Sequence, residues 1–429
     1  MYNEKELSYF ISCGYLPILD EKPLNQLFGY DFDALNLSNS NSIEDESIMI
    51  DEGVKTLRAC FEDLSSKDHV IPLSGGLDSR LIIASLLESG IQDRIQTVTY
   101  GQPGAYNYEI AVKLAKKLGL KHKTINLNKI KIDTESLLQT AKNGGSWTWL
   151  IDAFYNSIVC HEYGNDVVYW SGFMGDPLAG SHLPIQKSRT WDEAKSIFVK
   201  WNNLNHFANL PKLGLRLEDC LPETPIIDSS VLSFDEQIDF AIRQKNYIKR
   251  VVLVNNFKFR TPFTTPKWVE FTLSLPRELR FKRYLFNKIA LSAYPKIFKL
   301  PTEGYLGAGL HASDSKLLIR RALNKSREII SNVFNKDDLF KSFWESINVF
   351  RRVNYVDFQS AINNRKDYRE TIQENLADLK KRHIVDWVNL DEIYRQYRDG
   401  SYNNSLALLF LTSLEISLKA EEEQSEKRS

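Results

Sequence analysis

His69-Val-Ile-Pro-Leu-Ser-Gly-Gly-Leu-Asp-Ser-Arg80 is the stretch of sequence that decides the fold, and it runs directly into Leu81-Ile-Ile-Ala-Ser-Leu-Leu87. Two apolar runs separated by a glycine turn predict a buried strand, a tight loop and a helix whose first turn carries Asp78. The two glycines leave backbone N–H groups with no side chain in front of them. Such N–H groups, together with the positive end of a helix, favour an anion. The stretch therefore predicts a phosphate-binding loop, in which Asp78 holds Mg²⁺ against the phosphate.

The sequence beyond this loop alternates between strand and helix patterns. Strands are predicted at Ile95–Tyr100, His122–Leu127 and Val167–Ser171, and helices at Tyr108–Leu118 and Ala153–Glu162. This alternation predicts an α/β fold with a parallel sheet covered by helices on both faces. Ligands of such sheets bind beyond the carboxyl ends of the strands. Three loops are expected to meet there: Leu73–Ser79, Tyr100–Gly104 and Ser171–Asp176.

The third of these loops reads Ser171-Gly-Phe-Met-Gly-Asp-Pro-Leu-Ala-Gly180. Gly172 permits close approach of the backbone to a ligand, and Asp176 supplies a second carboxylate across the cleft from Asp78. Two carboxylates and a polyphosphate suit Mg²⁺, which takes one or two protein oxygens and keeps several waters. The alternative is that Asp176 only occupies a turn before Pro177.

Composition limits the classes of partner. The chain has 429 residues, with 55 basic and 55 acidic side chains, so its net charge favours neither nucleic acid nor an anionic membrane. No long apolar stretch predicts a membrane span, and the N-terminus lacks the pattern of a secretory signal. Four cysteines lie far apart in the sequence, which predicts reduced thiols and a cytoplasmic location.

Helical periodicity dominates the second half of the chain. Helices are predicted at Phe234–Lys258, Leu285–Tyr294, Lys316–Phe334 and Ser405–Lys419. We therefore expect an N-terminal helical or linker segment at 1–60, a nucleotide-binding domain at 61–310 and a helical C-terminal subdomain at 311–420. The charge-rich end of the chain, 421–429, is expected to be disordered.

Several of these motifs carry a resemblance to known proteins. Ser74-Gly-Gly-Leu-Asp-Ser79 resembles the pyrophosphate loop (PP-loop) of the ATP pyrophosphatases, which cleave ATP between the α- and β-phosphates. With Thr99–Gly104, Ser171–Asp176 and Phe259–Thr265, it resembles the synthetase domain of glutamine-dependent asparagine synthetases. The resemblance implies an adenine nucleotide alpha hydrolase-like fold that binds ATP and Mg²⁺. It also implies a ligase that adenylates a carboxylate, releases pyrophosphate and transfers the acyl group to ammonia or an amine.

The resemblance assigns roles to particular residues. Asp78 and Asp176 are the expected catalytic and metal-binding residues. The expected nucleotide-binding residues are Leu73, Ser74, Gly75, Gly76, Asp78, Ser79, Tyr100, Ser171 and Gly172.

The sequence also departs from the family at two places. Phe173 stands where relatives often have an acidic residue or a tyrosine, so another group must deprotonate the amine. Thr302 or Glu303 aligns with the lysine that neutralises the adenylate in relatives, and Lys299 lies a few residues earlier. Arg260 is a second candidate cation, or a structural ion-pair partner. These departures leave open an alternative function, a nucleotide-binding pseudo-enzyme that acts as a regulatory or assembly module.

The resemblance leaves the two substrates open. Leu7–Pro17 resembles the segment that opens the synthetase half, which predicts that no glutaminase precedes it. The nitrogen would then come from a separate ammonia-supplying glutaminase or from another amine. The acceptor is expected to be a small-molecule or peptide carboxylate, such as a uronic acid, and Ser181–Pro184 is a candidate wall of its pocket.

Overall fold

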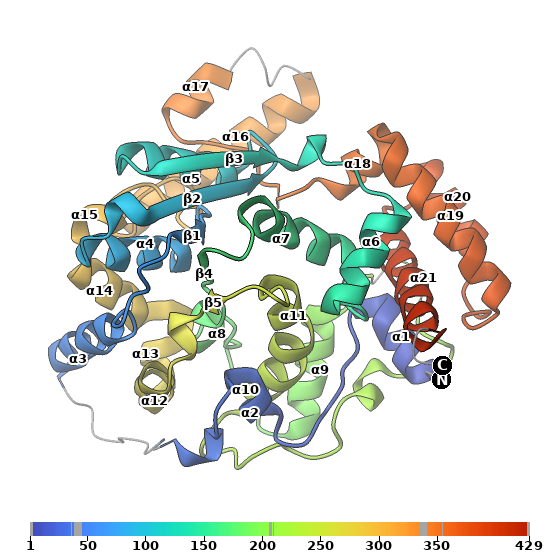
Figure 1. The fold of residues 1–429 in the computed structure, drawn as a ribbon, viewed down its shortest axis with the longest axis horizontal. Helices are drawn as coiled ribbons and strands as arrows, with labels where there is room; N and C mark the ends of the chain where they lie inside the picture. The colour runs from blue at the N-terminus through green and yellow to red at the C-terminus, as the bar shows by residue number, and fades with distance from the viewer. Residues whose placement is uncertain are drawn as a thin grey trace.

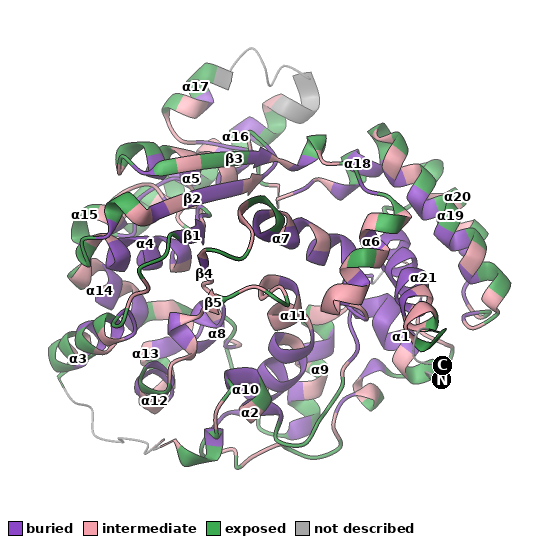
Figure 2. Ribbon diagram, in the orientation of Figure 1, coloured by how far each residue is buried: buried purple, intermediate pink, exposed green. Residues whose placement is uncertain are grey.

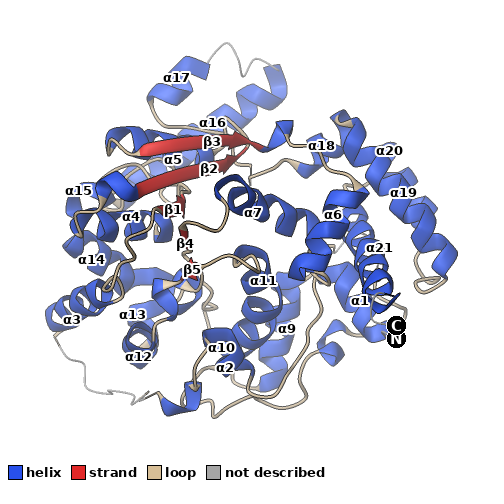
Figure 3. Ribbon diagram, viewed as in Figure 1, coloured by secondary structure: helices blue, strands red, loops and turns tan. Residues whose placement is uncertain are grey.

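The computed structural model describes residues 3–35, 37, 45–205, 208, 210–334, 341–353 and 355–426. Within these residues, five parallel strands form one sheet in the order β3-β2-β1-β4-β5. The strands are β1 (His69–Pro72), β2 (Ile95–Gly101), β3 (Lys121–Asn126), β4 (Val168–Trp170) and β5 (Phe259–Arg260). Helices surround this small sheet (Figure 3). The predicted α/β fold class is confirmed.

The two faces of the sheet pack into two separate hydrophobic clusters. Ile71 and Trp170 belong to one cluster, and their chain neighbours Val70 and Tyr169 belong to the other. This division follows from the alternation of side chains along a strand. The first cluster includes α3 (Glu46–Ala59), α4 (Asp78–Glu88), α5 (Tyr106–Lys117), α12 (Pro266–Ser274) and α14 (Tyr284–Ala293). The second includes α1 (Glu4–Cys13), α6 (Thr134–Thr140), α7 (Leu150–Tyr163), α19 (Lys366–Arg382) and α21 (Ser405–Glu426).

The first and last helices of the chain pack together. α1 and α21 lie side by side, and α21 also contacts α19 (Figure 1). The middle of α21 is buried around its whole circumference (Figure 2), as expected for a helix that is apolar on all sides. Further helices are α2 (Pro23–Phe28), α8 (Gly175–Leu178), α9 (Trp191–Asn202), α13 (Arg277–Arg280), α15 (Pro295–Phe298), α16 (Asp314–Phe334), α17 (Lys341–Ser346), α18 (Phe358–Asn364) and α20 (Leu390–Arg398). In the part of the chain that the structure describes, no helix combines the length and the apolar character needed to cross a membrane.

The end of the chain differs from the prediction of disorder from residue 421 onward. α21 continues to Glu426, because its acidic side chains find partners on other helices. Glu422 pairs with Arg382 at 2.5 Å. Glu423 pairs with a lysine of the π-helical segment η4 (Ala141–Gly145) at 2.5 Å. Residues 427–429 lie outside the described part.

The helix predicted at Phe234–Lys258 is shorter in the structure. It consists of α10 (Phe234–Ile238), the π-helical segment η6 (Asp239–Ile248) and α11 (Lys249–Val252). The chain leaves the helix at this point because the next segment extends the sheet. The backbone N–H of Tyr169 in β4 donates to the Lys258 carbonyl at 2.9 Å, next to β5. Pairing of this segment with β4 therefore overrides the helical periodicity of its sequence.

Candidate functional site

The glycine loop joins β1 to α4 as predicted, and its two serines hold its shape. The backbone N–H of Ser74 donates to Ser79 Oγ at 3.2 Å, and the two hydroxyls lie 3.1 Å apart. The N–H of Gly76 donates to Ser74 Oγ at 3.2 Å. Leu73, in contrast, packs into the core, and its N–H donates to the Val98 carbonyl at 2.8 Å. Its backbone and side chain therefore support the loop rather than line the cleft.

Gly75 connects the loop to two distant segments. Its N–H donates to Asn107 Oδ1 at 3.2 Å, and its carbonyl accepts from the N–H of Glu303 at 2.9 Å. A Cβ on Gly75 would lie 3.2 Å from both Asn107 Cα and Glu303 Cβ. The packing leaves little room for a side chain here, and it brings Glu303 to the edge of the loop.

The third loop packs directly on Asp78. A Cβ on Gly172 would lie 2.8 Å from Asp78 Cβ, and one on Gly175 would lie 2.7 Å from Asp78 Cγ. Asp176 follows in the first turn of α8, so the two predicted carboxylates lie across one narrow gap. Asp78 Oδ1 is buried and has no hydrogen-bond partner among the described residues. Buried polar atoms without partners are rare, so this oxygen is available to a ligand.

Arg283 lies between the two carboxylates. Its guanidinium pairs with Asp176 and lies 3.4 Å from Asp78 Oδ2. Its backbone is left-handed (φ 62°), as is that of Lys282 (φ 54°), so the chain turns sharply before α14. Burial raises the pKa of Asp78, and the positive charges of Arg283 and His182 counteract part of this shift. The site therefore contains its own counter-ion.

Two cavities meet at this point. One, of about 400 Å³, is lined by Ser79, Tyr100, Ser171, Gly172 and the aromatic side chains of β4 and Phe173. The other, of about 850 Å³, is lined by Gly76, Asn107, Glu303 and three cations, Lys282, Arg283 and Arg352. Ser74, Asp78 and Asp176 line both. An aromatic cavity joined to a basic one suits a ligand with a planar base at one end and phosphates at the other.

The protein supplies only some of the oxygen ligands that Mg²⁺ needs at this site. Among the described residues, no group of three or more His, Cys, Asp or Glu side chains forms a metal site. Asp78 has an unpartnered carboxylate oxygen, and the Asp176 carboxylate lies across the gap with Arg283 as its partner. Two carboxylates match the small number of protein ligands that Mg²⁺ takes when phosphates and waters supply the rest. The predicted pair of metal-binding residues is therefore brought together, with Arg283 at the same place.

Tyr100 also occupies its predicted place beside the first cavity. Its hydroxyl donates to Asn156 Oδ1 at 2.6 Å, and burial raises its pKa well above the ordinary value. The loop that follows β2 is held by Glu109, whose Oε1 accepts from the Gly104 N–H at 2.8 Å. Glu109 therefore has a structural role at the start of α5.

The structure also places the candidate cations. Lys299 is exposed and lines neither cavity, so it does not replace the lysine of the relatives. Arg260 donates to the backbone carbonyls of Glu62 and Asp63, at 3.0 and 2.8 Å, and stacks over Trp170. Its role is therefore structural. Glu303 does reach the second cavity, and burial raises its pKa.

Sequence reasoning missed the cations of the second cavity. Lys282, Arg283 and Arg352 follow no motif, and folding brings them to the loop from sites more than 200 residues away in the sequence. It also missed an ion pair between His182 Nδ1 and Asp239 Oδ2, 2.8 Å apart, beside the first cavity. No spacing of His and Asp in the sequence indicates that pair.

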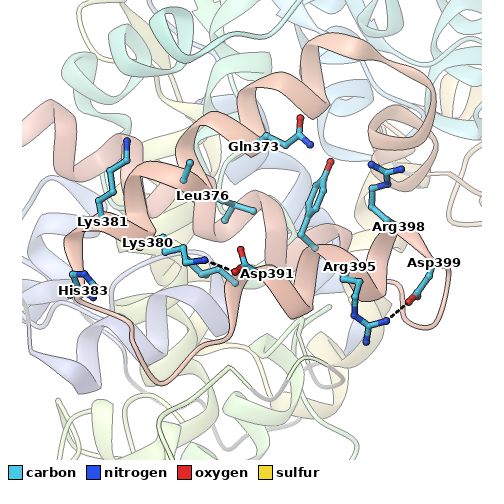
Figure 4. Close-up of a pocket in the computed structure, with 12 residues that line it drawn as sticks. Gln373, Leu376, Lys380, Lys381, His383, Asp391, Arg395, Arg398 and Asp399 are labelled. Atoms are coloured by element: carbon cyan, nitrogen blue, oxygen red, sulfur yellow. Dashed lines mark hydrogen bonds and ion pairs between the residues drawn. The ribbon is translucent and has the colours of Figure 1, made fainter.

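A further cavity, of about 990 Å³, lies between α19 and α20 (Figure 4). It shares no residue with the two cavities at the glycine loop. Some of its cations already have acidic partners: Lys380 pairs with Asp391, and Arg395 pairs with Asp399 at 2.9 Å. We assign it no part in the chemistry.

The fold and the loop define a nucleotide-binding α/β protein. Residues 68–145 match the family model described as "Queuosine biosynthesis protein QueC". This match covers β1, the glycine loop, β2 and β3, and it places the chain in the PP-loop ATP pyrophosphatase superfamily, whose members use ATP. No curated protein matches the chain significantly.

Proposed function

We propose that the protein is an ATP-dependent ligase that adenylates a substrate carboxylate and forms an amide. One observation carries the proposal. The glycine loop and the Asp78–Asp176 pair lie where an aromatic cavity meets a basic one, so a nucleotide bound across both would have its phosphates at the loop. The resemblance of the three loops to asparagine synthetases supports a carboxylate as the second substrate.

In the first step, a carboxylate oxygen attacks the α-phosphorus of ATP. The bond to the bridging oxygen of the β-phosphate breaks, and pyrophosphate leaves with the electron pair. The N–H groups of the first turn of α4 would stabilise the charge that develops on pyrophosphate, with Lys282 and Arg352 around it. Asp78 and Asp176 would hold Mg²⁺, which supplies further neutralisation of the phosphates when bound. Fixed dipoles and charges do this without rearrangement in the transition state.

In the second step, a nitrogen nucleophile attacks the acyl adenylate and AMP leaves. The nucleophile is ammonia from a separate glutaminase or an amine substrate. The carboxylate substrate is a small molecule or a peptide, with uronic acids as the first class to test. Phe173 is buried in the core against this cavity and has no group that accepts a proton.

The exchange of labelled pyrophosphate into ATP tests the first step directly. Wild-type protein with Mg²⁺ is compared with Asp78→Ala in the presence of D-glucuronate, D-galacturonate and an aspartate-containing tripeptide. We expect carboxylate-dependent exchange in the wild type and a loss of at least 100-fold in the variant. Exchange that proceeds equally well in both proteins would contradict the proposed site.

Arg283 favours one alternative. Because its guanidinium occupies the gap between Asp78 and Asp176, a protein that binds nucleotide without turning it over is the second candidate function. Such a pseudo-enzyme would bind ATP in calorimetry with the same affinity with or without Mg²⁺. A catalytic site would bind ATP more tightly with Mg²⁺, and the same titration separates the two.

A further inference from the structure

A third cavity at this site adjoins the aromatic cavity. It has a volume of about 340 Å³ and lies between α9 and the start of the π-helical segment η6. His182 and Arg243 line both this cavity and the aromatic cavity at the glycine loop. These two side chains therefore form the boundary at which a second substrate would meet the acyl adenylate.

His182 and Asp239 form a hydrogen-bonded pair at this boundary. His182 Nδ1 lies 2.8 Å from Asp239 Oδ2, and the side-chain amide of Gln244 donates to the same carboxylate at 3.2 and 3.3 Å. Residues five apart are neighbours in a π-helix, so the wide turn of η6 brings Gln244 onto Asp239. Burial raises the pKa of Asp239, but the charge and hydrogen bond of protonated His182, the charge of Arg243 and the hydrogen bond from Gln244 together outweigh it, and the pKa is lowered.

The hydrogen bond to Asp239 fixes the tautomer of His182. An ionised carboxylate only accepts hydrogen bonds, so the N–H at His182 Nδ1 donates to Asp239. Nε2 has no hydrogen-bond partner among the described residues. When the ring is neutral, Nε2 can accept a proton while the carboxylate holds the ring in this tautomer, which is the arrangement that general bases use.

The loop of Asp176 fixes the position of His182. The N–H of Ser181 donates to the Asp176 carbonyl at 3.2 Å, and its hydroxyl donates to the same atom at 2.8 Å. The chain therefore turns back after α8 and presents His182 to the cavity that holds Asp78. The same loop therefore carries Asp176, on the phosphate side of the site, and His182, at the boundary with the third cavity.

The walls of the third cavity indicate what would enter it. Apolar side chains from α9 and from the loop before it line one side: Leu183, Ala194, Ile197, Phe198 and Trp201. Two carboxylates, Asp235 on α10 and Asp239 on η6, line another side together with one arginine, Arg243. The two carboxylates outnumber the arginine and would attract an ammonium group, and the apolar wall would bury a hydrocarbon body. Free ammonia would need no cavity of this size.

We propose that His182 is the catalytic base of amide formation, that Asp239 is its positioning residue, and that the third cavity binds a primary amine with an apolar body. The inference rests on the proposed ligase and names the nitrogen donor that it uses. His182 also provides the proton acceptor that Phe173 cannot provide.

The amine nitrogen attacks the acyl carbon of the adenylate and a C–N bond forms. The bond from that carbon to the phosphate oxygen breaks, and AMP leaves with the electron pair. Before the attack, the ammonium form of the amine gives one proton to His182 Nε2, which passes it to solvent, and a second proton leaves the nitrogen for solvent as the amide forms. No oxidant, reductant or additional reactant is needed.

The test separates adenylation from proton removal. His182→Asn and Asp239→Asn are compared with the wild type, with His383→Asn as the matched control. His383 is exposed, lies at the cavity between α19 and α20, and has the left-handed backbone that asparagine tolerates. Each protein is assayed with D-glucuronate, D-galacturonate or the tripeptide for pyrophosphate exchange, and then with phenethylamine, ammonium and hydroxylamine as nucleophiles.

For His182→Asn we expect exchange within threefold of the wild type and a loss of at least 100-fold in amide formation from phenethylamine. Hydroxylamine is already unprotonated at neutral pH, so hydroxamate formation should stay within about threefold, which no general loss of structure would allow. Asp239→Asn should lose about tenfold in amide formation and keep hydroxamate formation. Wild-type kcat/KM should be at least tenfold higher for phenethylamine than for ammonium.

Amide formation by His182→Asn at the rate of His383→Asn would overturn the assignment of the base. A preference for ammonium over phenethylamine would overturn the assignment of the amine. Either result leaves wild-type exchange intact and so leaves the proposed ligase standing. Absence of exchange in the wild type with every carboxylate would instead reject the ligase, and this inference with it.

Discussion

Gly175→Ala places a methyl group against the carboxylate on which the site depends. The new Cβ would lie 2.7 Å from Asp78 Cγ, 2.8 Å from its Oδ1 and 3.0 Å from Phe263. An ordinary contact begins at 3.4 Å, so the carboxylate must move from 2.7 to 3.4 Å, a displacement of about 0.7 Å. Phe263 is fully buried and cannot move away easily. We therefore expect Asp78 to leave its position beside the phosphates.

Two magnitudes follow. Overpacking of this kind costs about 1–3 kcal/mol of stability. A shift approaching 1 Å in a positioned group lowers activity by up to about 100-fold. We therefore expect the Kd for ATP in the presence of Mg²⁺ to rise at least about tenfold, which corresponds to about 1.4 kcal/mol. Isothermal calorimetry on the folded variant measures the Kd, and urea unfolding measures the stability.

Gly119→Ala is the matched control for this variant. Gly119 has φ +64°, and a Cβ there would meet nothing within 4 Å. Left-handed strain should cost about 1–2 kcal/mol of stability without touching the site, so the affinity for ATP should stay at the wild-type value. Wild-type affinity in a folded Gly175→Ala protein would refute the reasoning about Asp78.

Three further predictions concern charged groups. Arg283→Ala removes the cation between Asp78 and Asp176, so Mn²⁺ without nucleotide should bind to the variant at least about tenfold more tightly than to the wild type. Electron paramagnetic resonance measures this affinity. Unchanged affinity would show that Arg283 does not compete with the metal. Hydrogen bonds from Lys419 and Lys381 lower the pKa of Asp378 to about 2. Between about pH 4 and pH 2 the unfolded state binds more protons than the folded state, so this contribution to stability is present above about pH 4 and is lost as the pH falls toward 2. In a plot of the urea midpoint against pH, Asp378→Asn should make the acid part of the curve flatter. An unchanged slope would contradict the assignment. Arg80 is buried and donates to the carbonyls of residues 297, 300 and 301, at 3.3, 3.0 and 2.5 Å. Arg80→Met should therefore lower the free energy of unfolding by about 3 kcal/mol or more, and a urea midpoint equal to that of the wild type would argue against this role.

Local sequence was sufficient to predict the strand, loop and helix that carry the phosphate-binding site. β1, the glycine loop and α4 follow one another within the stretch from His69 to Glu88, so apolar periodicity and two glycines determine them together. The pairing of Asp78 with Asp176 was also predictable. Both residues follow the carboxyl end of a parallel strand, and β1 and β4 are neighbours in the sheet.

The cations and the base were not predictable, because tertiary packing places them. Arg283 reaches Asp78 through a left-handed turn before α14, and nothing in its neighbourhood in the sequence encodes that turn. His182 was a candidate for the acceptor pocket on account of the loop it follows, but its partner Asp239 comes from a helix that begins more than 50 residues later. The helical pattern of residues 253–258 was misleading for a related reason, since pairing with β4 draws the end of that segment toward the sheet.

The products formed from ATP test the central claim most directly. Wild-type protein is incubated with Mg²⁺, ATP, phenethylamine and the probe carboxylates, and the phosphorus NMR spectrum of the mixture is compared with that of Asp78→Ala. The account predicts AMP and pyrophosphate in equal amounts from the wild type, and neither from the variant. ADP and inorganic phosphate, or product formation that survives the loss of Asp78, would contradict it.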